Sequence, residues 1–402
     1  MPVEVAPISQ PAHAVRSLYN GETTKMNKLC RQLSIESPNI TGRDCVFSFD
    51  VPVPDVPTHG ARIRIVCAGA CYIPRRSPSL TSLTSNSSAN SLITETSVEG
   101  DLPVSLSQHG FRDAALFPGY EVAGIVESLG TCVNDDCGYN VGDRVILYPF
   151  DGIPNGYVEY LVVHDLKYLI KIPDNVSLSV AAMLPAGALL AMNTVFAAHE
   201  HVQQLVRERD ENCVCKILIV GTGGLALWAL RIAAYYFSNM QSKVTITIAS
   251  LKDDGLKMAQ EFQRVNVVEW NEGLYEKQLI ERTMDACQGP VDIVIDFGTT
   301  SRSLHRSMQC LTKGGVVFVI KEVADRLLPK FCRLAEERDQ NIKPVEPGTL
   351  EQLNKLVQLV SSGEIEPPPH TVYPAEQAMD VVHKLCHSEI QGRAILRFYP
   401  AD

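Results

Sequence analysis

Two patterns of apolar residues divide the chain near residue 180. Before that point, apolar and β-branched residues alternate with polar ones in runs such as "ARIRIVCAGA" and "GYVEYLVV", which is typical of half-buried strands. After it, "SLSVAAMLPAGALLAMNTVF" has helical spacing, and "CKILIV" is a continuous apolar run of the kind that parallel sheets bury on both faces. The pattern therefore predicts an all-β part followed by an α/β part.

Strand-like and helical segments alternate throughout the second part. We expect strands at "KVTITIAS", "NVVEW", "VDIVIDFG" and "GGVVFVI", interspersed with helices at "LALWALRIAAYYF", "GLKMAQEF", "YEKQLIERTMDAC" and "SLHRSMQCL". This alternation indicates a doubly wound parallel sheet. The tail adds two helices and a last strand, "RAILRF".

Two segments fit neither pattern. Residues 1 to about 45 are mixed and punctuated by proline, so we expect a loosely ordered lead-in before a first strand at "CVFSFDV". More than half of residues 77–97 are Ser or Thr. Such a segment buries too little apolar surface to offset the entropy of ordering it, which predicts a flexible insertion. An unregulated surface loop is the simpler interpretation, and a phosphorylated segment following "RRSPS" is the alternative.

Length and charge narrow the class of protein. A chain of 402 residues is too long for one compact core, which predicts two domains. The net charge of -10 argues against a nucleic-acid-binding surface and favours small-molecule or nucleotide ligands. The twelve cysteines lack the framework of a small secreted domain, and no apolar run is long enough to cross a membrane. We therefore expect reduced thiols, no membrane span and a cytoplasmic location.

A glycine motif predicts a dinucleotide site. In "ILIVGTGGLALWALRIAA", Gly221, Gly223 and Ala226 follow a buried strand and open a helix. The first glycine allows the tight turn, the second lets a pyrophosphate approach the backbone, and the third position needs a small residue. Gly224 and Leu225 complete the turn, whose helix N–H groups hold phosphates.

The end of the next strand indicates which dinucleotide binds. NAD-binding proteins carry an acid there, whereas this chain has Ser250 and then Lys252, which suit the 2′-phosphate of NADP(H). The alternative is that Asp253 or Asp254 supplies the acid and that Lys252 is a solvated surface charge.

A further strand end, "VIDFGTTS", places Asp296 and Gly298 at the carboxyl edge of the predicted sheet. Ligands bind at this edge in open α/β folds, so we count both residues as cofactor contacts. A polar turn after a core strand is an equally good explanation of each residue.

These motifs together resemble the medium-chain dehydrogenase/reductase superfamily, which includes alcohol dehydrogenases and quinone oxidoreductases. The resemblance rests on the order of "PGYEVAGIVESLG", "VGDRV", "AAMLPAGALLAMNTVF", "VGTGGLA", "LTKGGVVFVI" and "GRAIL". It implies a GroES-like β domain and a Rossmann domain with the active site in the cleft between them. The implied boundaries are a lead-in at 1–45, the GroES-like domain at 46–187 with its insertion at about 75–110, the Rossmann domain at 188–345, and a segment at 346–402 that returns to the first domain.

The zinc ligands of the superfamily are mostly missing. Catalytic zinc needs three protein ligands and one open position. Cys71 matches the first ligand, but Tyr120 stands at the second and Ala186 at the third. Glu121 matches the family's Glu, yet one thiolate and one carboxylate are not a zinc site. The cysteine-rich lobe that binds structural zinc in the family is also absent after "GDRV". We expect no metal.

The resemblance then implies the zinc-independent, quinone oxidoreductase-like branch. We expect an NADP(H)-dependent reductase of quinones, enones or carbonyl compounds, with Cys71, Tyr72 and Tyr120 as the candidate catalytic residues. The two tyrosine hydroxyls suit hydrogen bonding to the acceptor. The alternative is a catalytically weak NADPH-binding regulatory or scaffold protein of the same fold. Relatives commonly form homodimers through the sheet edge near "GGVVFVI", so a homodimer is the expected assembly.

Overall fold

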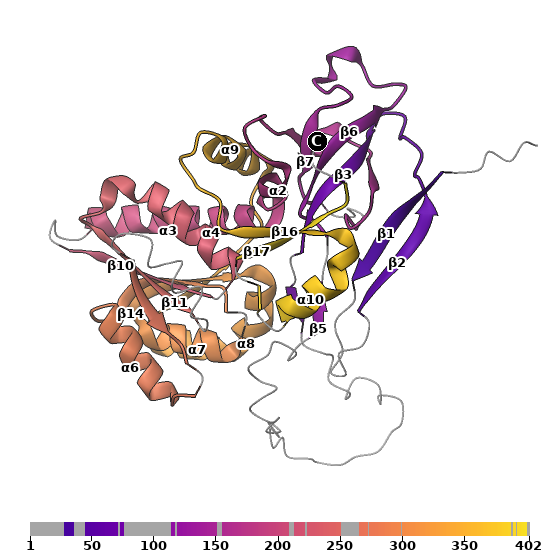
Figure 1. Ribbon diagram of the computed structural model, residues 1–402. Helices are drawn as coiled ribbons and strands as arrows, with labels where there is room; N and C mark the ends of the chain where they lie inside the picture. Colours follow the sequence, from indigo (N-terminus) through magenta and orange to yellow (C-terminus); the bar gives the residue numbers. More distant parts are fainter. Residues whose placement is uncertain are drawn as a thin grey trace, which may run out of the picture.

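The computed structural model describes most of the chain. The described residues are 28–35, 45–70, 73–75, 114–116, 119–150, 155–208, 213–221, 223–250, 265–271, 273–298, 300–386, 389–390 and 392–399. Its two main bodies are a six-stranded sheet covered by helices and a seven-stranded sheet built from both halves of the chain (Figure 1). The chain thus has the α/β fold that the apolar patterns predict.

The six-stranded sheet is wholly parallel. Its strands follow the spatial order β12-β11-β10-β13-β14-β15, so the direction of winding reverses between β10 and β13. This is the order of a dinucleotide-binding doubly wound sheet. The strands are β10 (Cys215–Val220), β11 (Val244–Ser250), β12 (Val265–Glu269), β13 (Val291–Asp296), β14 (Leu311–Ile320) and β15 (Asn341–Val345).

Helices cover both faces of this sheet (Figure 1). Alternate residues of β10 belong to different apolar clusters, because Ile217 and Ile219 pack toward one layer of helices and Leu218 and Val220 toward the other. The first layer holds α3 (Leu189–Glu208), α4 (Gly224–Tyr236) and α9 (Leu350–Ser361). The second holds α6 (Glu276–Ala286), α7 (Ser301–Cys310) and α8 (Lys321–Glu337). Burial on both faces explains why the strand sequences are continuously apolar.

The second sheet joins the first part of the chain to its end. Its strands are β3 (Ala61–Gly69), β6 (Val122–Leu129), β7 (Arg144–Leu147), β8 (Tyr160–Val163), β9 (Leu169–Lys171), β16 (His370–Pro374) and β17 (Arg393–Arg397). β17 pairs antiparallel with β3, which brings the carboxyl-terminal strands onto the β part of the molecule. Helix α10 (Ala378–Cys386) lies beside this junction (Figure 1).

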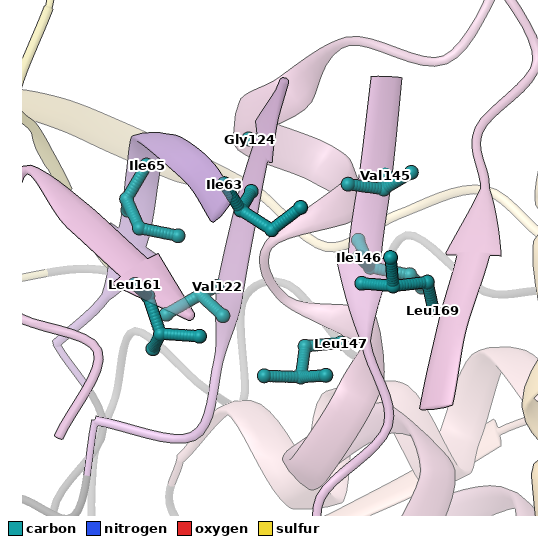
Figure 2. A pocket seen from close by; sticks show the side chains of 9 residues that line it. All are labelled: Ile63, Ile65, Val122, Gly124, Val145, Ile146, Leu147, Leu161 and Leu169. Atoms are coloured by element: carbon teal, nitrogen blue, oxygen red, sulfur yellow. The ribbon is translucent and has the colours of Figure 1, made fainter. Parts of the chain in front are cut away.

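A small cavity lies within the seven-stranded sheet. Its nine lining residues are apolar and come from β3, β6, β7, β8 and β9 (Figure 2). Ile63, Val145 and Leu161 are among them, and no polar side chain lines the space. Apolar cavities without polar partners stay free of ordered water, so this space is a packing defect of the core and offers no hydrogen bonds to a polar ligand.

The expectation of a loosely ordered lead-in is wrong for its last part. Residues Leu29–Ile35 form β1, which pairs antiparallel with β2 (Val46–Pro52). Cys30, Leu33 and Ile35 are buried in the same apolar cluster as the seven-stranded sheet. The physical reason is tertiary, because these few apolar positions gain a partner strand and a core that the local sequence does not reveal.

The structure also contains elements that the sequence did not indicate. Helix α8 has Pro329 in its interior and β15 contains Pro344, and proline obscures both patterns. Two further short strands are β4 (Ile73–Arg75) and β5 (Ala114–Leu116). The stretch predicted to be helical from residue 177 is divided into α2 (Leu178–Ala181), η4 (Leu184–Ala188) and α3. The helix expected at "GLKMAQEF" and the Ser/Thr-rich insertion lie outside the described residues. Within the described part, no helix is long and apolar enough to cross a membrane.

Candidate functional site

The turn between β10 and α4 has the geometry that a pyrophosphate requires. Gly221 has φ of 153°, in a region that favours glycine, and its N–H donates to the carbonyl of Ala249 at 3.0 Å. Gly223 caps α4, and within the described part of the chain a Cβ atom on it would meet no atom within 4 Å. The backbone is therefore open on the side of Gly223, and the free N–H groups of the first helical turn follow directly.

Gly221 and Ala226 show why the third position of the motif must be small. Ala226 is buried, and its Cβ atom lies 3.3 Å from where a Cβ atom on Gly221 would stand. A larger side chain at residue 226 would push α4 away from the strand end. Leu225, the second residue of the helix, lies beside Gly187: its Cδ2 atom is 3.8 Å from where a Cβ atom on Gly187 would stand. The motif residues that the sequence predicted thus come together at one place.

This turn lies at the point where the strand order reverses. β10 and β13 are neighbours and end together, and the N–H of Phe297 donates to the carbonyl of Val220 at 2.9 Å. The crevice outside the carboxyl ends of such strands is where ligands bind in open α/β sheets. The position of the turn therefore agrees with its motif.

Asp296, at the end of β13, is engaged within the fold. One carboxylate oxygen accepts hydrogen bonds from the N–H of Gly298 at 2.7 Å and the hydroxyl of Ser303 at 2.8 Å, and the other accepts from Ser307 at 2.9 Å. Burial raises the pKa of Asp296, and these three hydrogen bonds oppose the shift. Asp296 therefore shapes the turn at the site rather than offering a free carboxylate to it.

Gly298 belongs to the same turn. A Cβ atom on it would lie 2.0 Å from the hydroxyl oxygen of Ser303, so only glycine fits between β13 and α7. The interpretation of "VIDFG" as a polar turn after a core strand explains these two residues through contacts within the fold. A direct contact of Gly298 with a cofactor stays a prediction.

Arg393 lies against the first turn of α4, and sequence reasoning did not select it. A Cβ atom on Gly224 would come within 2.2 Å of the Cδ atom of Arg393 and 3.0 Å of its Nη1 atom. Residue 224 must therefore be glycine, because any side chain there would overlap the Arg393 side chain. This packing places guanidinium N–H groups beside the helix N-terminus, where the motif predicts a pyrophosphate.

Glu121 holds this arginine in place. The Arg393 guanidinium donates a hydrogen bond to the Glu121 carboxylate, and both side chains are buried. The other carboxylate oxygen accepts from the N–H of Gly187 at 2.9 Å. Gly69 also borders the carboxylate, since a Cβ atom there would lie 2.3 Å from Oε2. One buried carboxylate thus connects the β6 segment, η4, β3 and the start of β17.

The segments that correspond to the family's zinc ligands converge on Glu121. Tyr120 directly precedes it, and Ala186 is next to Gly187. Tyr120 and Ala186 provide neither imidazole nor thiolate, so these residues do not fit a tetrahedral zinc centre. Over the described ranges, no three His, Cys, Asp or Glu side chains are grouped so that they could hold a metal ion.

Tyr120 is the one candidate catalytic residue that the structure describes. It is 37% exposed, immediately beside the buried Glu121, so its phenol reaches solvent at the edge of this junction. Cys71 and Tyr72 follow β3 but lie outside the described residues, as does Lys252. Their assigned roles stay predictions.

Ser250 ends β11 as predicted, but it is buried. It is 2% exposed, and its carbonyl accepts a hydrogen bond from the N–H of Trp270 at 2.8 Å. The preference for NADP(H) over NAD(H) therefore stays a prediction, because Lys252, the other residue on which it depends, lies outside the described residues.

The sequence contained a weak signal for Glu121 and Arg393. Glu121 stood inside the ordered motif "PGYE", and Arg393 opens the apolar strand "RAILRF" as its one charge before the strand's end. A charge that opens a buried strand needs a partner. Nothing in the sequence identified which residue that partner is.

Comparison with known proteins finds a family model that matches part of the chain and several distant relatives. Residues 274–396 match the family model described as a zinc-binding dehydrogenase. A zinc-type alcohol dehydrogenase-like protein of Schizosaccharomyces pombe is 24% identical over 70% of this chain and 81% of that protein. An NADP-dependent alcohol dehydrogenase C of Mycolicibacterium smegmatis is 22% identical over 74% of this chain and 86% of that protein.

Solved structures agree on the fold. The quinone oxidoreductase from Coxiella burnetii superposes with a TM-score of 0.61 at 18% identity, covering 92% of this chain and 100% of that one. At this identity the likeness shows the fold alone.

Proposed function

The chain belongs to the medium-chain dehydrogenase/reductase superfamily, and we propose that it is a zinc-independent oxidoreductase that uses NADP(H) to reduce a quinone, enone or carbonyl compound. One observation carries the proposal. The open turn at Gly223, the N-terminus of α4 and the Arg393 guanidinium meet at the point where the strand order of the parallel sheet reverses.

These groups suit a dinucleotide because they combine backbone N–H donors with the N–H donors of a guanidinium. The free N–H groups of the first turn of α4 and the guanidinium would both face the pyrophosphate. NADPH is favoured over NADH by the Ser250 and Lys252 pair, and a relative is named as NADP-dependent. When bound, the cofactor supplies the hydride, and the protein's part is to bind and orient it.

The substrate side of the proposal rests on Tyr120. Its hydroxyl would donate a hydrogen bond to the acceptor oxygen and so favour the charge that develops there as hydride arrives. Cys71 and Tyr72 remain the other two candidates. Tyr120 and Ala186 supply no metal ligands, which supports a mechanism that needs no zinc.

The presence of Tyr120 and Ala186 at the positions of the family's zinc ligands also favours a second candidate function. A catalytically weak protein of this fold would keep the cofactor turn and lose the polarising group. It would bind NADPH as a regulatory or structural ligand. The two candidates differ in whether an acceptor consumes the cofactor.

A paired experiment separates them. Thermal unfolding with NADPH, NADH or Zn²⁺ measures binding, and loss of NADPH absorbance with quinones, enones and aldehydes measures turnover. We expect NADPH to raise the melting temperature most, and Tyr120→Phe to reduce turnover by about tenfold or more without changing that shift. Tyr275→Phe, at the 82% exposed tyrosine that directly precedes α6, is the matched control.

Each remaining outcome has a clear meaning. A melting temperature raised by NADPH, with no acceptor consumed, supports the weak binding protein. No shift with either nucleotide refutes both candidates, and stabilisation by Zn²⁺ refutes the zinc-independent mechanism.

A further inference from the structure

Strand β2 forms an outer edge of the β part of the molecule. On one side it pairs with β1 along its whole length, and Figure 1 shows it on the outer side of that strand. β1 in turn contacts the segment before β8, since the Leu33 N–H donates to the carbonyl of Tyr157 at 2.7 Å and the Glu159 N–H to that of Arg31 at 3.0 Å. Among the described strands, β2 has no second neighbour.

The outer strand carries unusual apolar exposure. Phe47 is 39% exposed and Phe49 is 50% exposed, and they are two residues apart on one face of β2. Val51 continues the same row. A seven-residue edge strand with exposed aromatic side chains and no proline before its last residue is a ready template for pairing with another strand.

The alternation of hydrogen bonds between β1 and β2 shows which backbone groups of β2 point away from β1. The Val53 N–H donates to the carbonyl of Lys28 at 2.8 Å, so these two residues face each other as a hydrogen-bonded pair. Because such pairs alternate along an antiparallel ladder, Val51, Phe49 and Phe47 also bond inward to β1. The N–H and carbonyl groups of the residues between them therefore point away from β1.

The outward groups are those of Ser48 and Asp50, together with Val46 and the carbonyl of Pro52. The β1 contacts agree with this alternation. The Arg31 carbonyl and the Leu33 N–H, opposite Asp50 and Ser48, form their hydrogen bonds on the side of β1 that faces away from β2.

We propose that β2 pairs with β2 of a second copy of this chain, antiparallel, about a two-fold axis through Phe49. Phe49 is the central residue of Val46–Pro52, so this register uses the whole strand. Ser48 then faces Asp50 of the second copy as a hydrogen-bonded pair, and both have the outward groups that this requires. Phe49 faces Phe49 of the second copy as a non-hydrogen-bonded pair, where side chains come closest.

Charge and packing agree with this register. Asp50 has Arg31 opposite it on β1 and would have Ser48 of the second copy on its other side, so no like charges face each other. Moving the axis by one residue to Asp50 would bring the two carboxylates together. In the proposed register, Phe47 packs against Val51 of the second copy, and the two Phe49 rings meet at the centre.

The partner is therefore a second copy rather than an unrelated strand, because the row is complementary to itself under two-fold symmetry. This surface is separate from the edge of the parallel sheet near "GGVVFVI". Two seven-residue strands bury less area than a standard interface, so the dimer is weak and concentration-dependent.

Sedimentation velocity of the full chain from about 1 to about 100 µM tests the proposal. We expect a monomer–dimer equilibrium that Ser48→Pro weakens at least about tenfold, because the proline removes an outward N–H and no bond to β1. Phe49→Lys should weaken it similarly by placing two cations face to face. Phe196→Lys, at a phenylalanine 36% exposed on α3, is the control and should leave it unchanged.

Cross-linking tests the register. Under mild oxidation, Phe49→Cys should give a covalent dimer and Ser48→Cys should not, because only residue 49 faces itself. A monomer at all concentrations overturns the proposal. A dimer that neither Ser48→Pro nor Phe49→Lys weakens also overturns it, because such a dimer would form through another surface, such as the edge of the parallel sheet. Cross-linking through Ser48→Cys instead of Phe49→Cys overturns the register.

Discussion

The Arg393 guanidinium and the Glu121 carboxylate form a buried ion pair between residues 272 positions apart in the chain. Arg393 opens β17 and packs on the first turn of α4, whereas Glu121 directly precedes β6. The pair therefore ties the glycine turn of the parallel sheet to the strands of the other sheet. Buried charges of this kind are retained only when each has a partner.

Removing one partner of this pair should be costly. Glu121→Gln or Arg393→Met removes one charge of a buried ion pair, and we expect each to lower the free energy of unfolding by about 3 to 5 kcal/mol. The double variant should lose clearly less than the sum, because neither charge then remains. Urea unfolding of the four proteins measures the coupling. Additive losses would show that the two side chains act independently.

Two adjacent glycines should differ in what they support. Gly223→Ala introduces a Cβ atom that meets no atom of the described residues within 4 Å, so we expect a stability loss below about 1 kcal/mol. It should weaken NADPH binding at least about tenfold, because the methyl group fills the space that a pyrophosphate would enter. Gly224→Ala should instead destabilise the fold by about 1 to 3 kcal/mol, because the new atom overlaps Arg393.

Calorimetric titration with NADPH and urea unfolding separate these effects. Gly273→Ala, in the turn before α6, is the control and should change neither quantity. An unchanged NADPH affinity in Gly223→Ala would contradict the assignment of this turn to the cofactor.

The pair of Glu276 and Arg306 predicts a pH dependence of stability. Burial alone would raise the pKa of Glu276, but the hydrogen bonds from Arg306, at 2.6 and 2.9 Å, together with the positive charges of Arg306 and Arg302, outweigh it and hold that pKa below the ordinary value of 4.5. A carboxyl group with a lowered pKa stabilises the fold above its unfolded pKa, and this stabilisation is lost as the pH falls through the folded pKa.

Glu276→Gln should therefore reduce stability at neutral pH and converge with the unmodified chain as the pH falls below about 4.5. Urea midpoints measured across this range check the prediction. Glu281→Gln, which removes an exposed ion pair with Lys277 on the same helix, should change stability by less than about 0.5 kcal/mol at any pH. A constant difference between the Glu276→Gln variant and the unmodified chain at all pH values would contradict it.

The small sheet of β4 and β5 predicts that residues 76–113 can be removed. Arg75 pairs with Ala114, so the two ends of this segment are neighbours. Replacing residues 76–113 by Asn-Gly would join the strands through a tight hairpin turn, and shortening a loop lowers its closure entropy cost. We expect unfolding stability to be unchanged or higher. A loss of more than about 2 kcal/mol would mean that the segment contributes to the core.

The order of the main elements could be predicted because it depends on local patterns. The continuous apolar run of β10 and the helical spacing of α4 are visible in neighbouring residues, and they located the glycine turn between this strand and this helix. β1 was missed because its few apolar positions make sense only beside β2. Asp296 was read as a ligand contact, whereas its oxygens are taken up by α7, which the sequence placed only a few residues away.

The sequence by itself determined the α/β class, the glycine turn and the absence of two zinc-ligand residue types, because periodicity and residue identity are local properties. The tertiary structure decided that Arg393 packs beside Gly224 and is held by Glu121, and that Phe47 and Phe49 remain exposed on an edge strand. These relationships depend on which distant segments meet when the core closes. A pairing between charges 272 residues apart leaves no periodic trace in the chain.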